Sequence, residues 1–347
     1  MHKTDLKTLT RSELIRFVEN LGEKPFRASQ LWLWLYHKGV TSFDEMSNLS
    51  KDFRERLKNA AEIRSIELFQ KTVSVSTGTQ KFLWRLQDGQ KIESVFIPES
   101  DRKTICISSQ AGCALGCTFC ATGGMGFRRN LEACEIVDQV LAVRRETGVQ
   151  PTNIVVMGMG EPFLNYENTM HALDLLNDPE GVAVGHRKIT VSTAGIVPRI
   201  RQYTEEDRPY KLAVSLNAVS GTLRTELMPV NKTYPLGDVI QSVRDYTRRT
   251  GRRATFEYVL LNRVNDFTAH ADRLLNLLKG LPCKVNLIVW NPTSDRFSRP
   301  DHKRVQAFAE RIQPLHAPVI LRLSRGDDID AACGQLAGEA GGEKPVW

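Results

Sequence analysis

The sequence predicts an α/β protein built on a partial (β/α)6 barrel, preceded by a small N-terminal helical domain and a β connector. From residue 104 onward, short apolar runs alternate with longer amphipathic stretches. This alternation is typical of a parallel sheet with right-handed helical crossovers. Six units are expected, whereas a closed barrel has eight, so the barrel should be open on one side.

The main domain is expected to span residues 101–336. Its predicted strands are Thr104–Ser109, Asn153–Met157, Lys188–Ser192, Lys211–Leu216, Thr255–Leu261 and Lys284–Trp290. The helical stretches between and after them are Leu131–Glu146, Tyr166–Leu176, Gly195–Gln202, Thr222–Leu227, Leu236–Arg249 and Thr268–Leu278. A further apolar run, Val319–Leu323, predicts an edge strand.

Residues 1–62 form the predicted helical domain. Thr10 and Glu13 fit a capping box at the start of the first helix, and Phe26–Tyr36 and Leu49–Ala61 predict two more. Aromatic residues beside lysines and arginines make this domain a candidate RNA-binding surface. Three packed helices with solvated charges explain the same pattern equally well.

The chain changes character on either side of the main domain. Residues 63–100 contain short apolar runs separated by turn signals at Thr77–Thr79 and Asp88–Gly89, which predicts a β connector. The Gly-rich residues 337–347 are expected to form a flexible tail.

Composition and charge restrict the class of protein. The net charge of +7 favours a polyanionic partner such as RNA. The chain has neither a run of about 20 apolar residues nor the apolar stretch of a signal peptide, so a cytoplasmic protein without membrane association is expected. The seven cysteines are an odd number, and three of them fall within eight positions, which indicates metal or redox chemistry.

The three clustered cysteines are Cys113, Cys117 and Cys120, in the spacing C-x3-C-x2-C. A [4Fe–4S] cluster is normally held by four thiolates, so three would leave one iron open to the amino and carboxylate groups of S-adenosylmethionine (SAM). Reduction of the cluster could then cleave SAM to a 5′-deoxyadenosyl radical. The alternatives are a zinc site, which usually requires a second cysteine pair, or three unrelated thiols.

Polar residues and glycines follow the predicted strands where the carboxyl ends of a parallel barrel place functional groups. Each could be an ordinary turn or capping residue, but together they predict the binding site for SAM. They are Gly160, Glu161, Ser192, Ser215, Leu216, Asn217 and Asn291. Glu161 is expected to accept a hydrogen bond from the SAM ammonium group.

Four segments resemble the RlmN/Cfr family of radical SAM enzymes, which methylate adenosine in RNA. The segments are Cys106–Cys113, the cysteine loop through Leu131, Gly158–Pro162 and Arg325–Leu336. The resemblance covers nearly the whole chain and implies a radical SAM barrel. It also implies 23S ribosomal RNA and tRNA as partners, a reducing electron donor such as flavodoxin, and a monomeric enzyme.

The resemblance also implies roles for three further residues. One SAM would methylate Cys333, and a second would supply the radical that activates this methyl group for addition to adenine. Glu93 matches the family's base, and Cys106 would release the product by forming a disulfide with Cys333. Ala111 and Pro162 are similar to the branch that methylates C2 rather than the resistance branch, which methylates C8.

Other functions remain open from the sequence. A radical SAM enzyme that modifies a protein or peptide would share the cysteine triplet but have no use for Cys106 and Cys333. A non-catalytic RNA-binding protein with a structural cluster would not cleave SAM. Candidate phosphate contacts are Arg128, Arg129, Arg248, Arg249, Arg252 and Arg253, although a solvated surface position explains each arginine better when it is taken alone.

Overall fold

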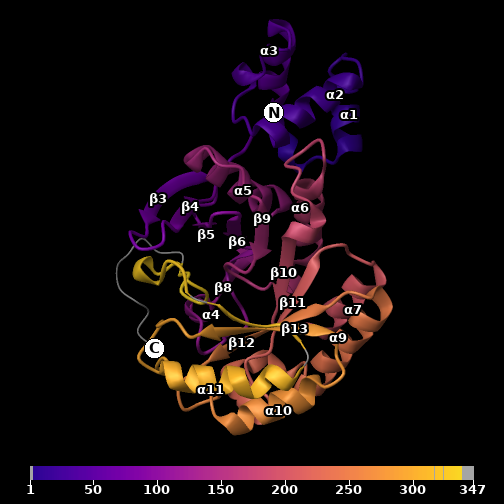
Figure 1. The fold of residues 1–347 in the computed structure, drawn as a ribbon. Coiled ribbons are helices and arrows are strands. Elements are labelled where there is room, and N and C mark those ends of the chain that lie inside the picture. Colours follow the sequence, from indigo (N-terminus) through magenta and orange to yellow (C-terminus); the bar gives the residue numbers. More distant parts are fainter. Residues whose placement is uncertain (1–2, 316, 323, 338–347) are drawn as a thin grey trace.

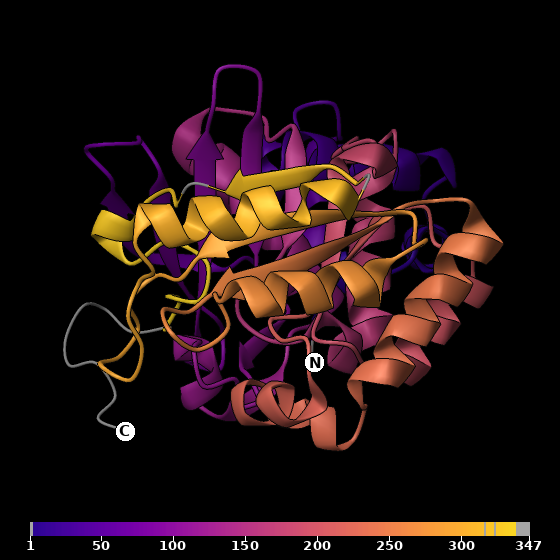
Figure 2. The ribbon, with the colours of Figure 1, turned by 60° about the horizontal axis from the view of Figure 1, so that its bottom comes forward.

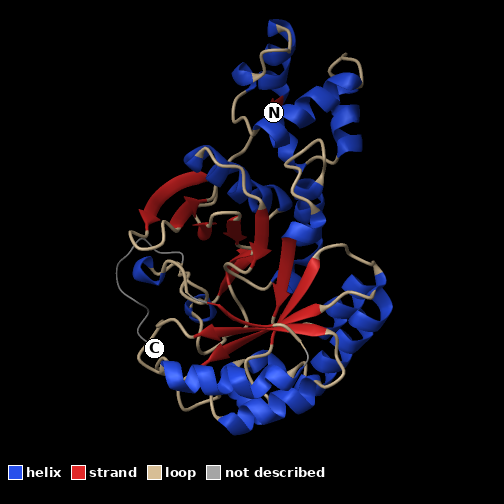
Figure 3. Cartoon of the chain, in the orientation of Figure 1, coloured by secondary structure: helices blue, strands red, loops and turns tan. Residues whose placement is uncertain are grey.

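The centre of the protein is one curved ten-stranded sheet (Figures 1 and 3). The computed structural model describes residues 3–315, 317–322 and 324–337. The strand order is β14-β13-β12-β11-β10-β9-β6-β5-β4-β3. The parallel part consists of β6 (Lys103–Ile107), β9 (Asn153–Val156), β10 (Ile189–Thr193), β11 (Lys211–Ser215), β12 (Ala254–Leu260), β13 (Cys283–Val289) and β14 (Val319–Arg322). The six predicted strands and the edge strand are therefore confirmed, apart from Leu323, which lies outside the described residues.

The predicted β connector belongs to the same sheet. Its strands are β3 (Glu67–Val73), β4 (Gln80–Arg85) and β5 (Lys91–Pro98), and β5 pairs antiparallel with β6. Sequence periodicity identified the strands but could not show their pairing partner, because strand pairing is a long-range contact. The connector thus extends the wall of the barrel.

Helices cover the outer face of the sheet and agree with the predicted positions. They are α5 (Ala133–Thr147), α6 (Tyr166–Asn177), α7 (Val197–Glu205), α8 (Gly221–Leu227), α9 (Leu236–Thr250) and α10 (Thr268–Leu278). An additional helix, α11 (His302–Ile312), was not predicted and lies beside α10 (Figure 2). The carboxylate of Asp301 accepts a hydrogen bond from the backbone N–H of Arg304 at its start, and α11 buries Val305 and Phe308.

The N-terminal helices form a separate layer above the barrel (Figure 1). They are α1 (Arg11–Asn20), α2 (Phe26–Trp32), which continues as the π-helical turn η2 (Leu33–Lys38), and α3 (Lys51–Ala60). The capping box is present: the Thr10 hydroxyl accepts from the Glu13 N–H, and the Glu13 carboxylate accepts from the Thr10 N–H.

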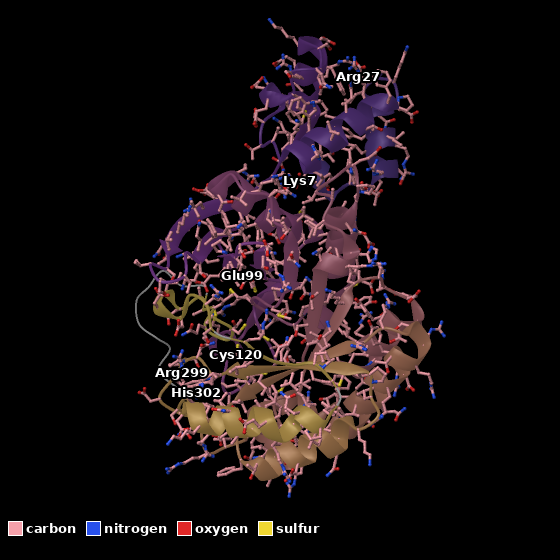
Figure 4. All side chains as sticks on the ribbon, viewed as in Figure 1. Lys7, Arg27, Glu99, Cys120, Arg299 and His302 are labelled. Carbon is pink, nitrogen blue, oxygen red and sulfur yellow. The ribbon has the colours of Figure 1, made fainter. Side chains whose placement is uncertain are left out.

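Lys7 lies at the junction between this helical layer and the barrel (Figure 4). Its ammonium group donates to Asp138 Oδ1 on α5 at 2.6 Å and to the carbonyl of Arg64 at 2.8 Å, and both charged side chains are almost fully buried. Nearby, β1 (Thr4–Asp5) pairs with β2 (Ala61–Glu62). The junction is therefore tied by a buried ion pair and a short parallel ladder.

The described part of the chain contains no helix long and apolar enough to cross a membrane. Apart from Ala337, the predicted tail lies outside the described residues.

Candidate active site

A small hairpin presents the three cysteines of the triplet. Its strands are β7 (Gln110–Gly112) and β8 (Phe127–Asn130), and the loop between them includes the short helix α4 (Ala121–Gly124). Gly112 has φ +75°, and a Cβ at this position would lie 1.9 Å from the carbonyl oxygen of Gly126. Since no side chain fits there, the hairpin can close around the loop only with glycine at this position.

The Cys113, Cys117 and Cys120 thiols face one cavity at the open end of the barrel. Burial raises the pKa of Cys113 to about 12, with a smaller contribution from Cys120, so the sulfur atoms lie near one another. Figure 4 shows Cys120 close to the C-terminal segment. Within the described chain, no group of three or more His, Cys, Asp or Glu side chains is arranged around a single ion. In a four-iron cluster each thiolate binds a different iron, so three thiols along one cavity wall fit a cluster rather than a mononuclear site.

Most of the residues predicted to bind SAM line the same cavity. They are Gly160, Glu161, Ser192, Ser215, Asn217 and Asn291. Leu216 is the exception, because its side chain is fully buried and does not line the cavity. Strand alternation explains this difference: Ser215 faces the interior, so the next side chain points into the outer layer.

Glu161 is buried and lines the cavity. Its two carboxylate oxygens accept from the backbone N–H groups of Phe163 at 2.9 Å and Ala194 at 2.7 Å. Burial raises the pKa of Glu161 to about 7, and these hydrogen bonds oppose the shift. The neighbouring Gly160 has φ +97°, and a Cβ there would clash with Gln110, so the lack of a side chain lets these two residues pack closely together.

Asn291 holds the segment that carries Cys333. Its Nδ2 donates to the Cys333 carbonyl at 3.1 Å, while its Oδ1 accepts from Arg299 Nη2 and Ser324 Oγ. The amide is therefore already hydrogen-bonded to protein at both ends. In this structure Asn291 positions the C-terminal segment against the cavity.

Cys333 itself lines the cavity, and its accessible surface faces the cavity interior. Burial among surrounding protein atoms raises the pKa of this thiol, and Arg322 opposes the shift. Cys106, on β6, lies near it: burial raises the pKa of Cys106 to about 12, and Cys333 adds to the shift. Both are free thiols here, so the disulfide expected between them is not formed in this structure.

Comparison with known proteins identifies the family. Residues 4–63 match the family described as ribosomal RNA large subunit methyltransferase N-terminal domain, and residues 107–275 match the radical SAM superfamily. The chain is 46% identical over 344 residues to the dual-specificity RNA methyltransferase RlmN of Syntrophobacter fumaroxidans, covering 98% of this chain and 100% of that protein. This chain belongs to the RlmN family.

Further relatives agree with this assignment. RlmN of Anaeromyxobacter dehalogenans is 45% identical, with 98% of this chain and 94% of that protein covered. The crystal structure of a radical SAM methyltransferase from Sphaerobacter thermophilus superposes with a TM-score of 0.92 at 45% identity, covering 97% of this chain and all of that one. The predicted family and radical SAM fold are confirmed, and the chain is a radical SAM RNA methyltransferase.

Glu93, the base implied by the RlmN resemblance, lies on β5 and is 1% exposed. Its Oε2 accepts from the backbone N–H of Ala337 at 2.8 Å, and its Oε1 lies 3.4 Å from Lys81 Nζ. Glu93 does not line the cavity formed by the cysteines. It therefore contacts the C-terminal segment four residues beyond Cys333.

Sequence reasoning missed Glu257, a second buried carboxylate, on β12. It lines the cavity, is 5% exposed and accepts from Asn286 Nδ2 at 2.9 Å through Oε1, while no described residue donates to its Oε2. Desolvation raises the pKa of Glu257. The signal was an acidic residue in the middle of an otherwise apolar and aromatic strand.

The predicted phosphate contacts separate into two groups. Arg128 is exposed and makes no side-chain hydrogen bond or ion pair with any described residue, whereas Arg129 is paired with Asp88 and Glu135. The other four lie between the end of α9 and the start of β12. They therefore lie at the amino ends of the strands, opposite the cysteine loop.

Proposed function

We propose that this enzyme methylates C2 of a specific adenosine in 23S ribosomal RNA and C2 of an adenosine in a tRNA anticodon loop. The observation that carries the proposal is the placement of Cys333 and Cys106 near one another beside the cavity of the cysteine triplet. A thiol that carries the methyl carbon and a second that resolves the adduct are what this chemistry requires. Ala111 and Pro162 support C2 over C8 as the target.

The cofactors are inferred from the side chains that could bind them. Cys113, Cys117 and Cys120 would hold a [4Fe–4S] cluster, and the residues around Gly160 and Glu161 would bind SAM, used twice per turnover. When bound, the two together supply a carbon-centred radical by reductive cleavage of SAM. The Glu161 carboxylate can still accept from the SAM ammonium group, because each of its oxygens has a second lone pair.

Protein side chains carry out the remaining steps of the reaction. The Cys333 sulfur first takes a methyl group from SAM by displacement. This carbon would lose one hydrogen atom to the SAM-derived radical and then form the bond to adenine C2, and the adduct would return one electron to the cofactor site. Glu93 takes the ring proton, and the Cys106 thiolate attacks the Cys333 sulfur. A sulfur–sulfur bond forms as the carbon–sulfur bond breaks, and the released carbon takes a proton to complete the new methyl group. The disulfide must be reduced before the next turnover.

The proposal places Glu93 in a constrained position. Its carboxylate accepts from the Ala337 N–H and faces Lys81. The contact with Ala337 links the proposed base to the segment that carries Cys333.

The proposed organisation and partners extend to the rest of the chain. Residues 1–62 would bind RNA, residues 63–100 would connect to the catalytic core at 101–336, and 337–347 would be a tail. We infer a cytoplasmic monomer that receives electrons from a small reductant such as flavodoxin. The RNA substrates and the redox-active thiols support this setting.

The test is anaerobic methylation of ribosomal RNA fragments and tRNA by the reconstituted enzyme, with mass-spectrometric mapping of the methylated atom. We expect methyl groups on adenine C2 in both RNAs and one methyl group on Cys333 of the purified protein. Methylation of adenine C8, or turnover in a protein that never carries a methyl on Cys333, would refute the proposal.

A further inference from the structure

The inner face of the barrel continues beyond the cavity toward the amino ends of the strands. Alternate residues of a strand share a face, so Lys211 lies on the same face of β11 as Ser215, which lines the cavity. Four residues of strand separate the two Cα atoms by about 13 Å. On β13, Lys284 shares a face with Asn286, whose amide donates to the cavity residue Glu257.

The strand register places these lysines in rows with residues of the active site. One row runs from Cys106 through Val155 and Thr190 to Lys211. The next row contains Ser192, Ala213, Thr255 and Lys284. Both rows lie on the face that carries Cys106, Ser192 and Ser215, so the lysines point into the open barrel rather than toward its helices.

Four cations gather at this end of the barrel. We name Arg102, Lys188, Lys211 and Lys284 the inner basic cluster. Lys188 lies just before β10 and Arg102 just before β6. Partial burial lowers the pKa of Lys211, and Lys284, Lys188 and Arg102 lower it further, so Lys211 lies near each of the other three.

The inner basic cluster lacks counterions in the described part of the chain. None of its four side chains makes a hydrogen bond or ion pair with a described residue, although Asp101 precedes Arg102. Elsewhere the protein neutralises cations directly, as in the pair of Arg304 with the buried carboxylate of Asp266. Unneutralised like charges repel one another, so this cluster costs stability unless an anion occupies it.

We propose that the inner basic cluster binds backbone phosphates of the RNA, so that the target nucleotide enters the barrel from the amino ends of its strands. The inference rests on the proposed function in that the target base must reach Cys106 and Cys333. A base held in a pocket is extruded from its stack, and its flanking phosphates remain outside. The rows of strand residues described above connect the inner basic cluster with the active site along one face of the sheet.

The test compares two double variants of the anaerobically reconstituted full-length enzyme. Lys211→Ala/Lys284→Ala removes two charges from the inner basic cluster. Arg273→Ala/Lys279→Ala removes the same charge from α10 and from the residue that follows it, in the outer layer of the barrel. Binding of a tRNA anticodon stem-loop is measured over a range of salt concentrations, together with KM for methylation.

We expect the inner variant to raise KM for RNA at least tenfold. The slope of log affinity against log salt should fall by about 1.4, because each lost contact to single-stranded RNA contributes about 0.7. The outer variant should resemble the wild type. Lys211→Arg/Lys284→Arg should restore binding, which a purely structural role for the lysine side chains would not predict.

Two controls distinguish a loss of RNA binding from a loss of folding or of cofactor binding. Methylation of Cys333 and RNA-independent cleavage of SAM should be unchanged in the inner variant, which shows that it folds and binds its cofactors. An unchanged salt slope and KM in that variant would overturn the inference. If the wild type binds the stem-loop but methylates no RNA, the proposed function fails, while the salt slopes still test the phosphate contacts.

Discussion

At the scale of single residues, replacement of Cys333 and replacement of Cys106 should stop the reaction at different steps. Cys333→Ala removes the methyl carrier, so no RNA should become attached to the protein. Cys106→Ala keeps the carrier and the cofactor site but lacks the thiol that attacks the Cys333 sulfur, so it should stop at a covalent protein–RNA adduct. Nuclease digestion and mass spectrometry should find a nucleotide on Cys333 in Cys106→Ala alone.

The matched control is Cys283→Ala, which removes a buried thiol of β13 that does not line the cavity. It should turn over normally and accumulate no adduct. A folded Cys106→Ala enzyme with bound substrate RNA and no adduct would contradict the roles of Cys333 as methyl carrier and Cys106 as resolving thiol.

Glu93 can be tested with a nearly isosteric change. Glu93→Gln keeps an oxygen that accepts from the Ala337 N–H but removes the carboxylate that would take the ring proton. Methylation of Cys333 and cleavage of SAM should persist, while RNA product formation falls by roughly 10²–10⁴-fold, the usual contribution of a general base. Single-turnover kinetics would separate these steps, and wild-type product release would remove Glu93 from the mechanism.

Four of the cysteines that sequence reasoning assigned to the active site line one cavity in the structure. Cys113, Cys117 and Cys120 were found by their spacing, and Cys333 was found by the resemblance of the motif around it. Glu257 was missed because its environment arises from strand pairing, which brings Asn286 of β13 beside it. Its buried and unpartnered Oε2 is a property of the tertiary structure and cannot be read from one strand.

At the scale of elements, the hairpin of β7 and β8 should depend on Gly112 much more than on Gly116. Both have positive φ, but a Cβ at Gly112 would clash with the Gly126 carbonyl, whereas a Cβ at Gly116 meets no atom within 4 Å. Gly116→Ala should cost about 1–2 kcal/mol from backbone strain alone. Gly112→Ala should cost more and displace the loop that carries the cysteines.

The measurement is iron and sulfide content after anaerobic reconstitution, combined with thermal unfolding. Gly116→Ala should retain the cluster with a lowered midpoint, and Gly112→Ala should lose most of it. Equal cluster content in the two variants would show that the hairpin tolerates the displacement and that its close approach is not required.

Element prediction succeeded where a local pattern was strong. The alternation of strands and helices from β6 to β14 follows from apolar periodicity, and the capping box located the start of α1. The helix α11 was overlooked although Asp301 and the spacing of Val305, Phe308 and Ile312 fit a capped amphipathic helix. The membership of β3, β4 and β5 in the barrel sheet was not predictable, because pairing of β5 with β6 reverses the strand direction expected inside a parallel barrel.

At the scale of the whole molecule, the helical layer and the barrel should be coupled through the Lys7–Asp138 ion pair. Both side chains are nearly inaccessible to solvent, and Asp138 also accepts from the Ile66 N–H. Removing one partner leaves an uncompensated buried charge, so Lys7→Met should destabilise the protein by about 3–5 kcal/mol. Lys7→Met/Asp138→Leu removes both charges and should recover part of that loss, because replacing a buried pair by apolar groups is often close to neutral.

Denaturant unfolding of the wild type, both single variants and the double variant would measure the coupling, and limited proteolysis would show where it acts. If the pair anchors the helical layer, Lys7→Met should expose cleavage sites between α3 and β3 while SAM cleavage at the barrel persists. Affinity for tRNA should then fall more than the catalytic rate on saturating RNA, because the proposed RNA-binding layer loses its fixed orientation. Additive free-energy changes with no new cleavage would instead mean that the remaining junction contacts, including the ladder of β1 and β2, are sufficient to hold the layer in place.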